Sequence, residues 1–210
     1  MSDVDGFVHR FEPAGRAGAP ALLLLHGTGG DENDLVGLGR AVAPGAALLS
    51  PRGRVTENGM PRFFRRLAEG VFDLAEVEAR ALELADFVEA AAERYGIDRR
   101  RLIALGFSNG ANIAASMMLL RPSLLGGAAL LRPMVILEPE APAGLDGVPV
   151  LIQAGAADPM VLPGQPARLA AMLRAAGAEV TLEVSPGGHG LTQADVDGLA
   201  AWLSARAGHG

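Results

Sequence analysis

The segment Gly106-Phe107-Ser108-Asn109-Gly110 has the pattern G-x-S-x-G, which is typical of enzymes whose serine attacks a carbonyl carbon. In such enzymes the serine lies on a sharp turn between a strand and a helix, and small residues on either side let the two backbones approach each other. An apolar segment, 102–107, ends at the serine, and a mostly apolar segment, 111–120, follows it. Because this context fits a strand and a buried helix, we predict that Ser108 is a nucleophile rather than an idle serine in a Gly-rich turn.

A serine nucleophile needs a general base and an acid that orients the base, in the chain order Ser, Asp or Glu, His when the serine turn has this form. Two histidines follow Ser108. His189 lies in a Gly-rich segment after a predicted strand, whereas His209 is one residue from the end of the sequence, so we predict that His189 is the base.

The acid is expected in the loop after the apolar run 148–154, which contains Asp158. Asp146 precedes that run and therefore belongs to the wrong end of the sheet. Asp195 and Asp197 fall in the last predicted helix, where a solvated face is expected. Asp158 is the predicted acid, and its carboxylate would accept a hydrogen bond from the His189 ring.

The segment His26-Gly27-Thr28-Gly29-Gly30 follows another apolar run, 21–25. Its glycines allow the backbone to approach a substrate carbonyl, so the backbone N–H groups of Thr28 and Asn109 are the predicted oxyanion donors. His26 could be mistaken for a base, but its place at the end of a buried strand favours a ring that braces the loop. Asp31 is expected to cap the helix that follows or to position the loop.

A long connection, 51–72, follows the predicted strand 46–49 and should reach the edge of the active site. Four apolar side chains could line an acyl pocket there, namely Met60, Phe63, Phe64 and, after Asp158, Met160. Phe63 and Phe64 could equally bury the loop against the core. Arginines are frequent in this connection, at positions 52, 54, 62, 65 and 66. A solvated face is the simpler interpretation of these arginines and of Arg132, and attraction of an anionic substrate is the alternative.

Short β-type runs alternate with helical stretches along the chain, which predicts an α/β fold with a mostly parallel central sheet and helices on both faces. The 210 residues are expected to form one domain, 1–210. Predicted strands are 7–11, 21–25, 46–49, 102–107, 127–131, 148–154 and 179–184, and predicted helices are 31–42, 74–95, 111–120, 166–176 and 192–206. Asp73 and Gly96 are predicted to cap the second helix, and Thr192 to begin the last one.

Composition excludes some classes of function. The net charge is −6, which argues against a general nucleic-acid binder, and the absence of cysteine excludes disulfides, thiolate metal sites and a cysteine nucleophile. The acidic first residues do not have the pattern of a signal peptide, and the longest apolar run near the start, 21–25, is too short to span a membrane, so a cytoplasmic protein is expected.

The chain resembles the phospholipase/carboxylesterase family of α/β-hydrolases, which includes acyl-protein thioesterases, and within it small bacterial carboxylesterases of the hydroquinone-resistance type. The matching segments are 25–32, the stretch that begins with 51–53 and ends with 58–59, 106–111, 155–158 and 188–189. The resemblance implies an α/β-hydrolase fold, a triad of Ser108, Asp158 and His189, backbone donors at Thr28 and Asn109, a small ester or thioester as substrate, no cofactor or metal, and often a homodimer. Asn109 stands where many thioesterases have Gln, so hydrolysis of a carboxylic ester is expected rather than of an acyl-protein.

Three other functions use the same fold. A dienelactone-hydrolase-like enzyme would need a thiol, which this chain lacks. A cofactor-free perhydrolase or haloperoxidase would keep the same triad, and peroxide-dependent halogenation would reveal it. A non-catalytic ligand-binding module would tolerate loss of triad residues, yet all three are present.

Overall fold

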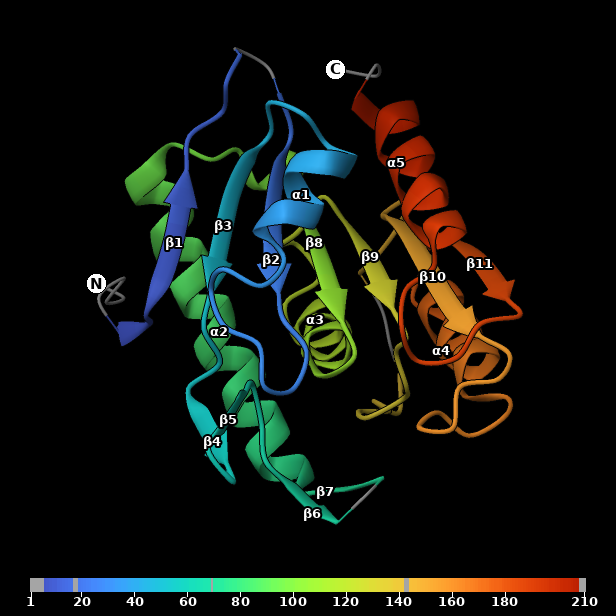
Figure 1. Ribbon diagram of the computed structural model, residues 1–210. Coiled ribbons are helices and arrows are strands. Elements are labelled where there is room, and N and C mark those ends of the chain that lie inside the picture. Colours follow the sequence, from blue (N-terminus) through green and yellow to red (C-terminus); the bar gives the residue numbers. More distant parts are fainter. Residues whose placement is uncertain (1–5, 17–18, 69, 142–143, 208–210) are drawn as a thin grey trace.

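Seven strands form one sheet at the centre of the computed structural model, which describes residues 6–16, 19–68, 70–141 and 144–207 (Figure 1). In sheet order the strands are β1 (His9–Glu12), β3 (Ala47–Pro51), β2 (Ala21–Leu25), β8 (Leu102–Phe107), β9 (Gly127–Leu131), β10 (Pro149–Gly155) and β11 (Glu179–Ser185). β1 runs antiparallel to β3, and the other neighbours are parallel. The prediction of a mostly parallel α/β sheet is confirmed.

Helices cover both faces of this sheet. On one face lie α1 (Val36–Val42) and α5 (Gln193–Ala207), and on the other α2 (Leu74–Tyr95), α3 (Asn109–Leu120) and α4 (Gln165–Ala175) (Figure 1). Side chains of a strand point alternately to the two faces, so Leu23 and Leu25 of β2 join the core beside α2 and α3, while Leu22 and Leu24 join the core beside α1. Every residue of β2 is buried, as expected of a strand covered on both sides.

Helix α2 begins and ends where the sequence predicts. The Asp73 side chain accepts a hydrogen bond from the N–H of Glu76, and Gly96 ends the helix in the left-handed conformation at φ 66°. The predicted helix 31–42 was wrong in its first part, because α1 begins only at Val36. The Asp31 side chain instead accepts from the N–H of Asn33 at 2.8 Å, a local turn that competes with helix formation. A single turn of 3-10 helix, Arg99–Arg101, precedes β8.

The long connection between β3 and α2 folds into two hairpins. The first pairs β4 (Val55–Glu57) with β5 (Met60–Arg62), and the second pairs β6 (Arg66–Ala68) with β7 (Val71–Phe72). Asn58 and Gly59 form the first turn with positive φ values of 51° and 79°, a geometry that Asn-Gly adopts readily. Both hairpins lie beyond the carboxyl ends of the central strands (Figure 1). In the described part of the chain, no helix is both long and apolar enough to cross a membrane.

Candidate active site

Ser108 lies between the end of β8 and the start of α3, in a conformation that is rare for residues other than glycine, with φ 52° and ψ −114°. The turn is tight because two glycines flank it. A Cβ on Gly106 would meet the main chain of Gly110 and Ala111, and one on Gly110 would overlap the carbonyl group of Leu25. The strained turn projects the Ser108 side chain out of the sheet, as a nucleophile requires.

The three residues predicted as a triad form one chain of hydrogen bonds. The distance from Ser108 Oγ to His189 Nε2 is 2.9 Å, and that from His189 Nδ1 to Asp158 Oδ2 is 2.7 Å. The Asp158 side chain is only 1% exposed, and its second oxygen accepts from the N–H of Met160 at 2.9 Å. Asp146 lies beside Gly177, before β11 begins, and so at the opposite end of the sheet. His209 lies outside the described residues.

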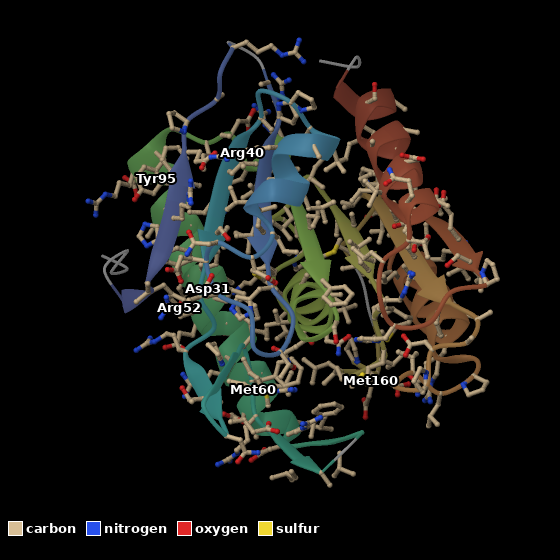
Figure 2. The ribbon with its side chains drawn as sticks, viewed as in Figure 1. Asp31, Arg40, Arg52, Met60, Tyr95 and Met160 are labelled. Carbon is tan, nitrogen blue, oxygen red and sulfur yellow. The ribbon has the colours of Figure 1, made fainter. Side chains whose placement is uncertain are left out.

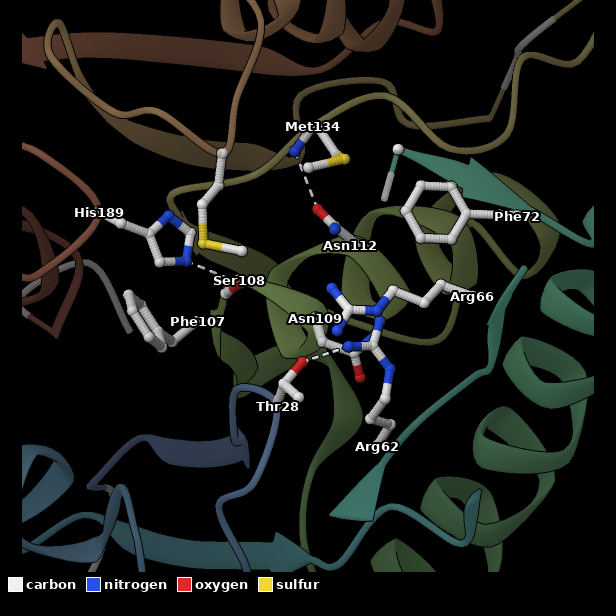
Figure 3. Close-up of a pocket in the computed structure, with 12 residues that line it drawn as sticks. Thr28, Arg62, Arg66, Phe72, Phe107, Ser108, Asn109, Asn112, Met134 and His189 are labelled. Carbon is white, nitrogen blue, oxygen red and sulfur yellow. Dashed lines mark hydrogen bonds between the residues drawn. The ribbon is translucent and has the colours of Figure 1, made fainter. Parts of the chain in front are cut away.

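The two residues predicted as oxyanion donors, Thr28 and Asn109, line a cavity together with Ser108 (Figure 3). Their backbone N–H groups have no acceptor among the described residues. For Asn109 this follows from its position at the first turn of α3, where backbone N–H groups point out of the helix. Its side-chain Oδ1 accepts from the N–H of Phe63 at 2.8 Å, which ties the turn of Ser108 to the connection carrying the hairpins.

His26 braces the loop that carries Thr28. Its Nε2 accepts from the N–H of Gly53 at 2.9 Å, and its Nδ1 donates to the carbonyl oxygen of Gly27 at 2.7 Å. The ring is 1% exposed, and burial lowers the pKa of His26 below its usual value. A neutral ring matches these two bonds, since one nitrogen donates and the other accepts.

Arg132 and Asp195 are buried, so the expectation of solvated side chains was wrong for both. Arg132 follows β9 with φ 56° and extends behind the loop of His189. Its Nε donates to the carbonyl oxygen of Gly188 at 2.9 Å, and its Nη2 to that of Gly190 at 3.1 Å. These carbonyls belong to the two neighbours of His189, so Arg132 fixes the backbone that presents the imidazole. The sequence did contain a signal for the position of Asp195. Thr192 and Asp195 are three residues apart, the spacing of a reciprocal cap, and they form such a cap at the start of α5.

The cavity beside Ser108 has a volume of about 260 Å³. Its lining residues are Thr28, Arg62, Arg66, Gly70, Phe72, Phe107, Ser108, Asn109, Asn112, Met134, Met160 and His189. Of the four predicted pocket residues, Met160 lines it. Phe63 and Phe64 are 3% and 0% exposed and pack in the core, which was the alternative role considered for them. Met60 is 37% exposed and is not among the lining residues.

The other arginines of the connection pair with carboxylates outside the cavity. Arg52 donates to both oxygens of Glu32 at 2.6 and 2.8 Å and lies beside Asp31 (Figure 2). Arg54 pairs with Glu83, and Arg65 lies within ion-pair distance of Asp73 and Glu76. Arg52, Arg54 and Arg65 therefore lie outside the cavity, whereas Arg62 and Arg66 line it together with Ser108.

Residues 10–206 match the model of the phospholipase/carboxylesterase family. The chain belongs to this family. It is 48% identical over 181 residues to MhqD of Bacillus subtilis (strain 168), which carries a provisional description as a hydrolase, and the match covers 86% of this chain and 90% of MhqD. The crystal structure of a Bacillus cereus carboxylesterase superposes with a TM-score of 0.92 at 44% identity, covering 96% of this chain and 94% of that one. A structure of YahD with malic acid superposes with a TM-score of 0.89 at 32% identity, covering 95% and 98%.

Membership of the phospholipase/carboxylesterase family identifies the chain as a carboxylesterase-type hydrolase of the α/β-hydrolase superfamily. In such folds the residues that do chemistry follow the carboxyl ends of parallel strands. Here Thr28, Ser108, Arg132 and Asp158 follow β2, β8, β9 and β10 in that order across the sheet.

Proposed function

We propose that the chain is a serine carboxylesterase that hydrolyses small carboxylic esters through an acyl-enzyme on Ser108. The observation that carries the proposal is the continuous pair of hydrogen bonds from Ser108 Oγ to His189 and from His189 to the buried Asp158. In this arrangement the base can accept the serine proton, and the carboxylate holds the ring in the tautomer that leaves Nε2 free to accept it.

In the first half of the reaction, Ser108 Oγ attacks the ester carbonyl carbon while His189 Nε2 takes its proton. The negative charge that develops on the carbonyl oxygen would be held by the backbone N–H groups of Thr28 and Asn109, for which the described part of the chain offers no acceptor. The N-terminus of α3 adds a partial positive charge behind the same oxygen. His189 then gives the proton to the departing alcohol, and the acyl group remains on Ser108.

In the second half, water replaces the alcohol. His189 Nε2 removes a proton from the water as its oxygen attacks the acyl carbon, and returns that proton to Ser108 Oγ as the acid leaves. Asp158 stabilises the imidazolium in both halves without itself taking a proton. A thioester differs only in its leaving group, so it can enter the same cycle.

The size of the cavity favours short acyl groups. A volume of about 260 Å³ lies below the usual range for drug-sized ligands. The malic acid named in the structure of the relative YahD is a small polar acid, and we propose that the acid released by this chain is likewise small.

The test is the hydrolysis of p-nitrophenyl acetate and butyrate by wild type and by Ser108→Ala. We expect the substitution to lower kcat/KM by about 10⁴-fold or more, because nucleophile and base act as a unit. A fluorophosphonate probe should label the wild type at Ser108, located by mass spectrometry of the digested protein.

Ser204→Ala is the matched control, because Ser204 is exposed and lies near the C-terminal end of α5, which is at the opposite end of the molecule from the carboxyl end of β8 (Figure 1). This variant should keep wild-type hydrolysis and wild-type labelling. Near-normal turnover by Ser108→Ala, or failure of the probe to react with the wild type, would overturn the proposed function.

A further inference from the structure

Two arginines form one wall of the cavity. Arg62 ends β5 and Arg66 begins β6, so the two hairpins of the connection bring them together beside Ser108 (Figure 3). Arg62 is 4% exposed, and the side chain of Arg66 is 29% exposed. Among the described residues that line the cavity, two are arginines and none is an aspartate or glutamate.

Among the described residues, Glu57 is the carboxylate within ion-pair distance of both arginines. Glu57 Oε1 accepts from Arg66 Nε at 2.7 Å, and Glu57 Oε2 lies 3.4 Å from Arg62 Nε. Burial by itself raises the pKa of Glu57, but the hydrogen bond from Arg66 and the charge of Arg62 hold it below its usual value. Glu57 is therefore ionised and balances one of the two cations, so this cluster of three described residues keeps an excess of one positive charge.

The hydrogen bonds of the two arginines are also incomplete. Arg62 donates from Nε to the carbonyl oxygen of Phe64 and from Nη1 to Thr28 Oγ1. Arg66 uses Nε alone, and neither of its Nη atoms has an acceptor among the described residues. Arg132 differs, because its three nitrogens all donate to Asp195 or to carbonyl oxygens. The cavity pair thus keeps donors for a ligand, whereas Arg132 is saturated by the protein.

An anion in the cavity would offset an electrostatic cost that the free protein carries. Burial lowers the pKa of Arg62, and the charge of Arg66 lowers it further, against the opposing effect of Glu57. A planar carboxylate matches the fork of donors on a guanidinium, so it is the anion best suited to Arg66.

The position of His189 indicates which half of the ester carries this anion. His189 protonates the departing alcohol, so the alcohol must leave on the side of the imidazole. In Figure 3 Arg62 and Arg66 lie across Ser108 from His189, beside Thr28 and Asn109. The acyl half, which stays on Ser108, therefore extends toward the arginines. Phe72 and Met134 line the same cavity and can contact its carbon chain.

We propose that the acyl group carries a free carboxylate held by Arg66 and Arg62, so that the substrates are monoesters of short dicarboxylic acids. This inference rests on the proposed function and narrows it. In this proposal Arg66 determines specificity. Arg62 contributes a second positive charge and also holds the side-chain hydroxyl of Thr28 by a hydrogen bond.

The test compares charged and neutral esters of the same acids. Monomethyl esters of the C4 to C7 linear dicarboxylic acids are compared with their dimethyl esters, counted per ester group, at pH 7.5, by following methanol release with ¹H NMR. We expect at least one monomethyl ester to exceed its dimethyl ester in kcat/KM by about tenfold or more, the usual worth of a hydrogen-bonded charge pair. Raising NaCl from 0.05 to 0.5 M should lower this ratio.

Arg66→Gln should bring the ratio close to one, and Arg66→Lys should keep part of it. The matched control is Arg65→Gln, because Arg65 is the neighbouring arginine but pairs with Asp73 and Glu76 outside the cavity. It should keep the wild-type ratio. Circular dichroism and Tm establish that each variant is folded.

Several results would overturn the inference. The first is a ratio of monomethyl to dimethyl kcat/KM of one or less across the series for the wild type. The second is an equal loss of kcat/KM for both kinds of ester in Arg66→Gln. The third is a preference for a carboxylate only on the alcohol half of the ester, which is tested with O-acetylated hydroxy acids. These differ from failure of the proposed function, in which no ester would be hydrolysed in a manner that depends on Ser108.

Discussion

Arg132 and Asp195 form an ion pair from which solvent is excluded. Arg132 Nη2 lies 2.5 Å from Asp195 Oδ2, and the two side chains are 0% and 5% exposed. The pair joins the end of β9 to the first turn of α5, and the same arginine holds the carbonyl groups on both sides of His189. A buried ion pair adds little over an apolar pair, but removing one partner leaves an uncompensated charge. The arrangement therefore couples the stability of α5 to the position of His189.

This coupling can be measured by a double-mutant cycle. We expect Arg132→Met and Asp195→Leu each to lower the free energy of unfolding by about 3–5 kcal/mol, and the double variant to lose less than their sum by at least about 1 kcal/mol. Urea unfolding at pH 7 measures all four proteins. The exposed pair Arg168 and Glu138 is the control and should show coupling close to zero. Strict additivity at Arg132 and Asp195 would contradict the prediction.

The buried ring of His26 should make stability depend on pH. Burial lowers its folded pKa below the usual 6.5, so the unfolded chain binds a proton more readily than the folded one. This contribution to stability is complete above pH 6.5 and is lost as the pH falls toward the folded pKa. Unfolding free energies of wild type between pH 7.5 and 5 should fall more steeply than those of His26→Gln. Parallel pH curves for the two proteins would show that His26 is not the group responsible.

Local signals in the sequence account for how well each element could be predicted. The carboxylate of Asp73 and the left-handed glycine Gly96 mark both ends of α2, so its range was predicted correctly. The start of α1 was missed because Asp31 bonds to the N–H of Asn33, an alternative to the helix that periodicity does not reveal.

The residues around Ser108 could be ordered from the sequence because the carboxyl ends of parallel strands meet at one edge of the sheet. The surroundings of each arginine could not be predicted from the sequence. Arg62, Arg65 and Arg66 are close together in the sequence and have the same side chain. The strand pairing of the two hairpins places Arg62 and Arg66, but not Arg65, at the cavity. Arg132 and Asp195 are 63 residues apart, and burial of a charge depends on such a distant partner.

Asp158→Asn should separate the orientation of His189 from the fold of its loop. If the new amide keeps its oxygen on the N–H of Met160, its NH₂ group faces His189 Nδ1 and favours the tautomer in which Nε2 carries the proton. That nitrogen can no longer accept the proton of Ser108, so we expect kcat for p-nitrophenyl acetate to fall by about 10³–10⁴-fold with little change in Tm. Asp146→Asn, at the other end of the sheet and exposed, should keep wild-type activity. A large loss in Asp146→Asn with none in Asp158→Asn would reverse the assignment.

The turn of Ser108 should tolerate no side chain at Gly110, whereas a side chain at Gly37, a glycine of α1, should stabilise the protein. A Cβ on Gly110 would overlap the carbonyl groups of Leu25 and His26, which are main-chain atoms of β2 and its loop and have no room to move. We expect Gly110→Ala to cost about 3 kcal/mol or more in urea unfolding. Gly37 lies exposed in α1, and a methyl group added there would meet no heavy atom within 4 Å outside its own turn of helix, so Gly37→Ala should stabilise by about 0.5–1 kcal/mol. Equal stabilities for the two variants would mean that β8 and α3 do not approach β2 as closely as the turn requires.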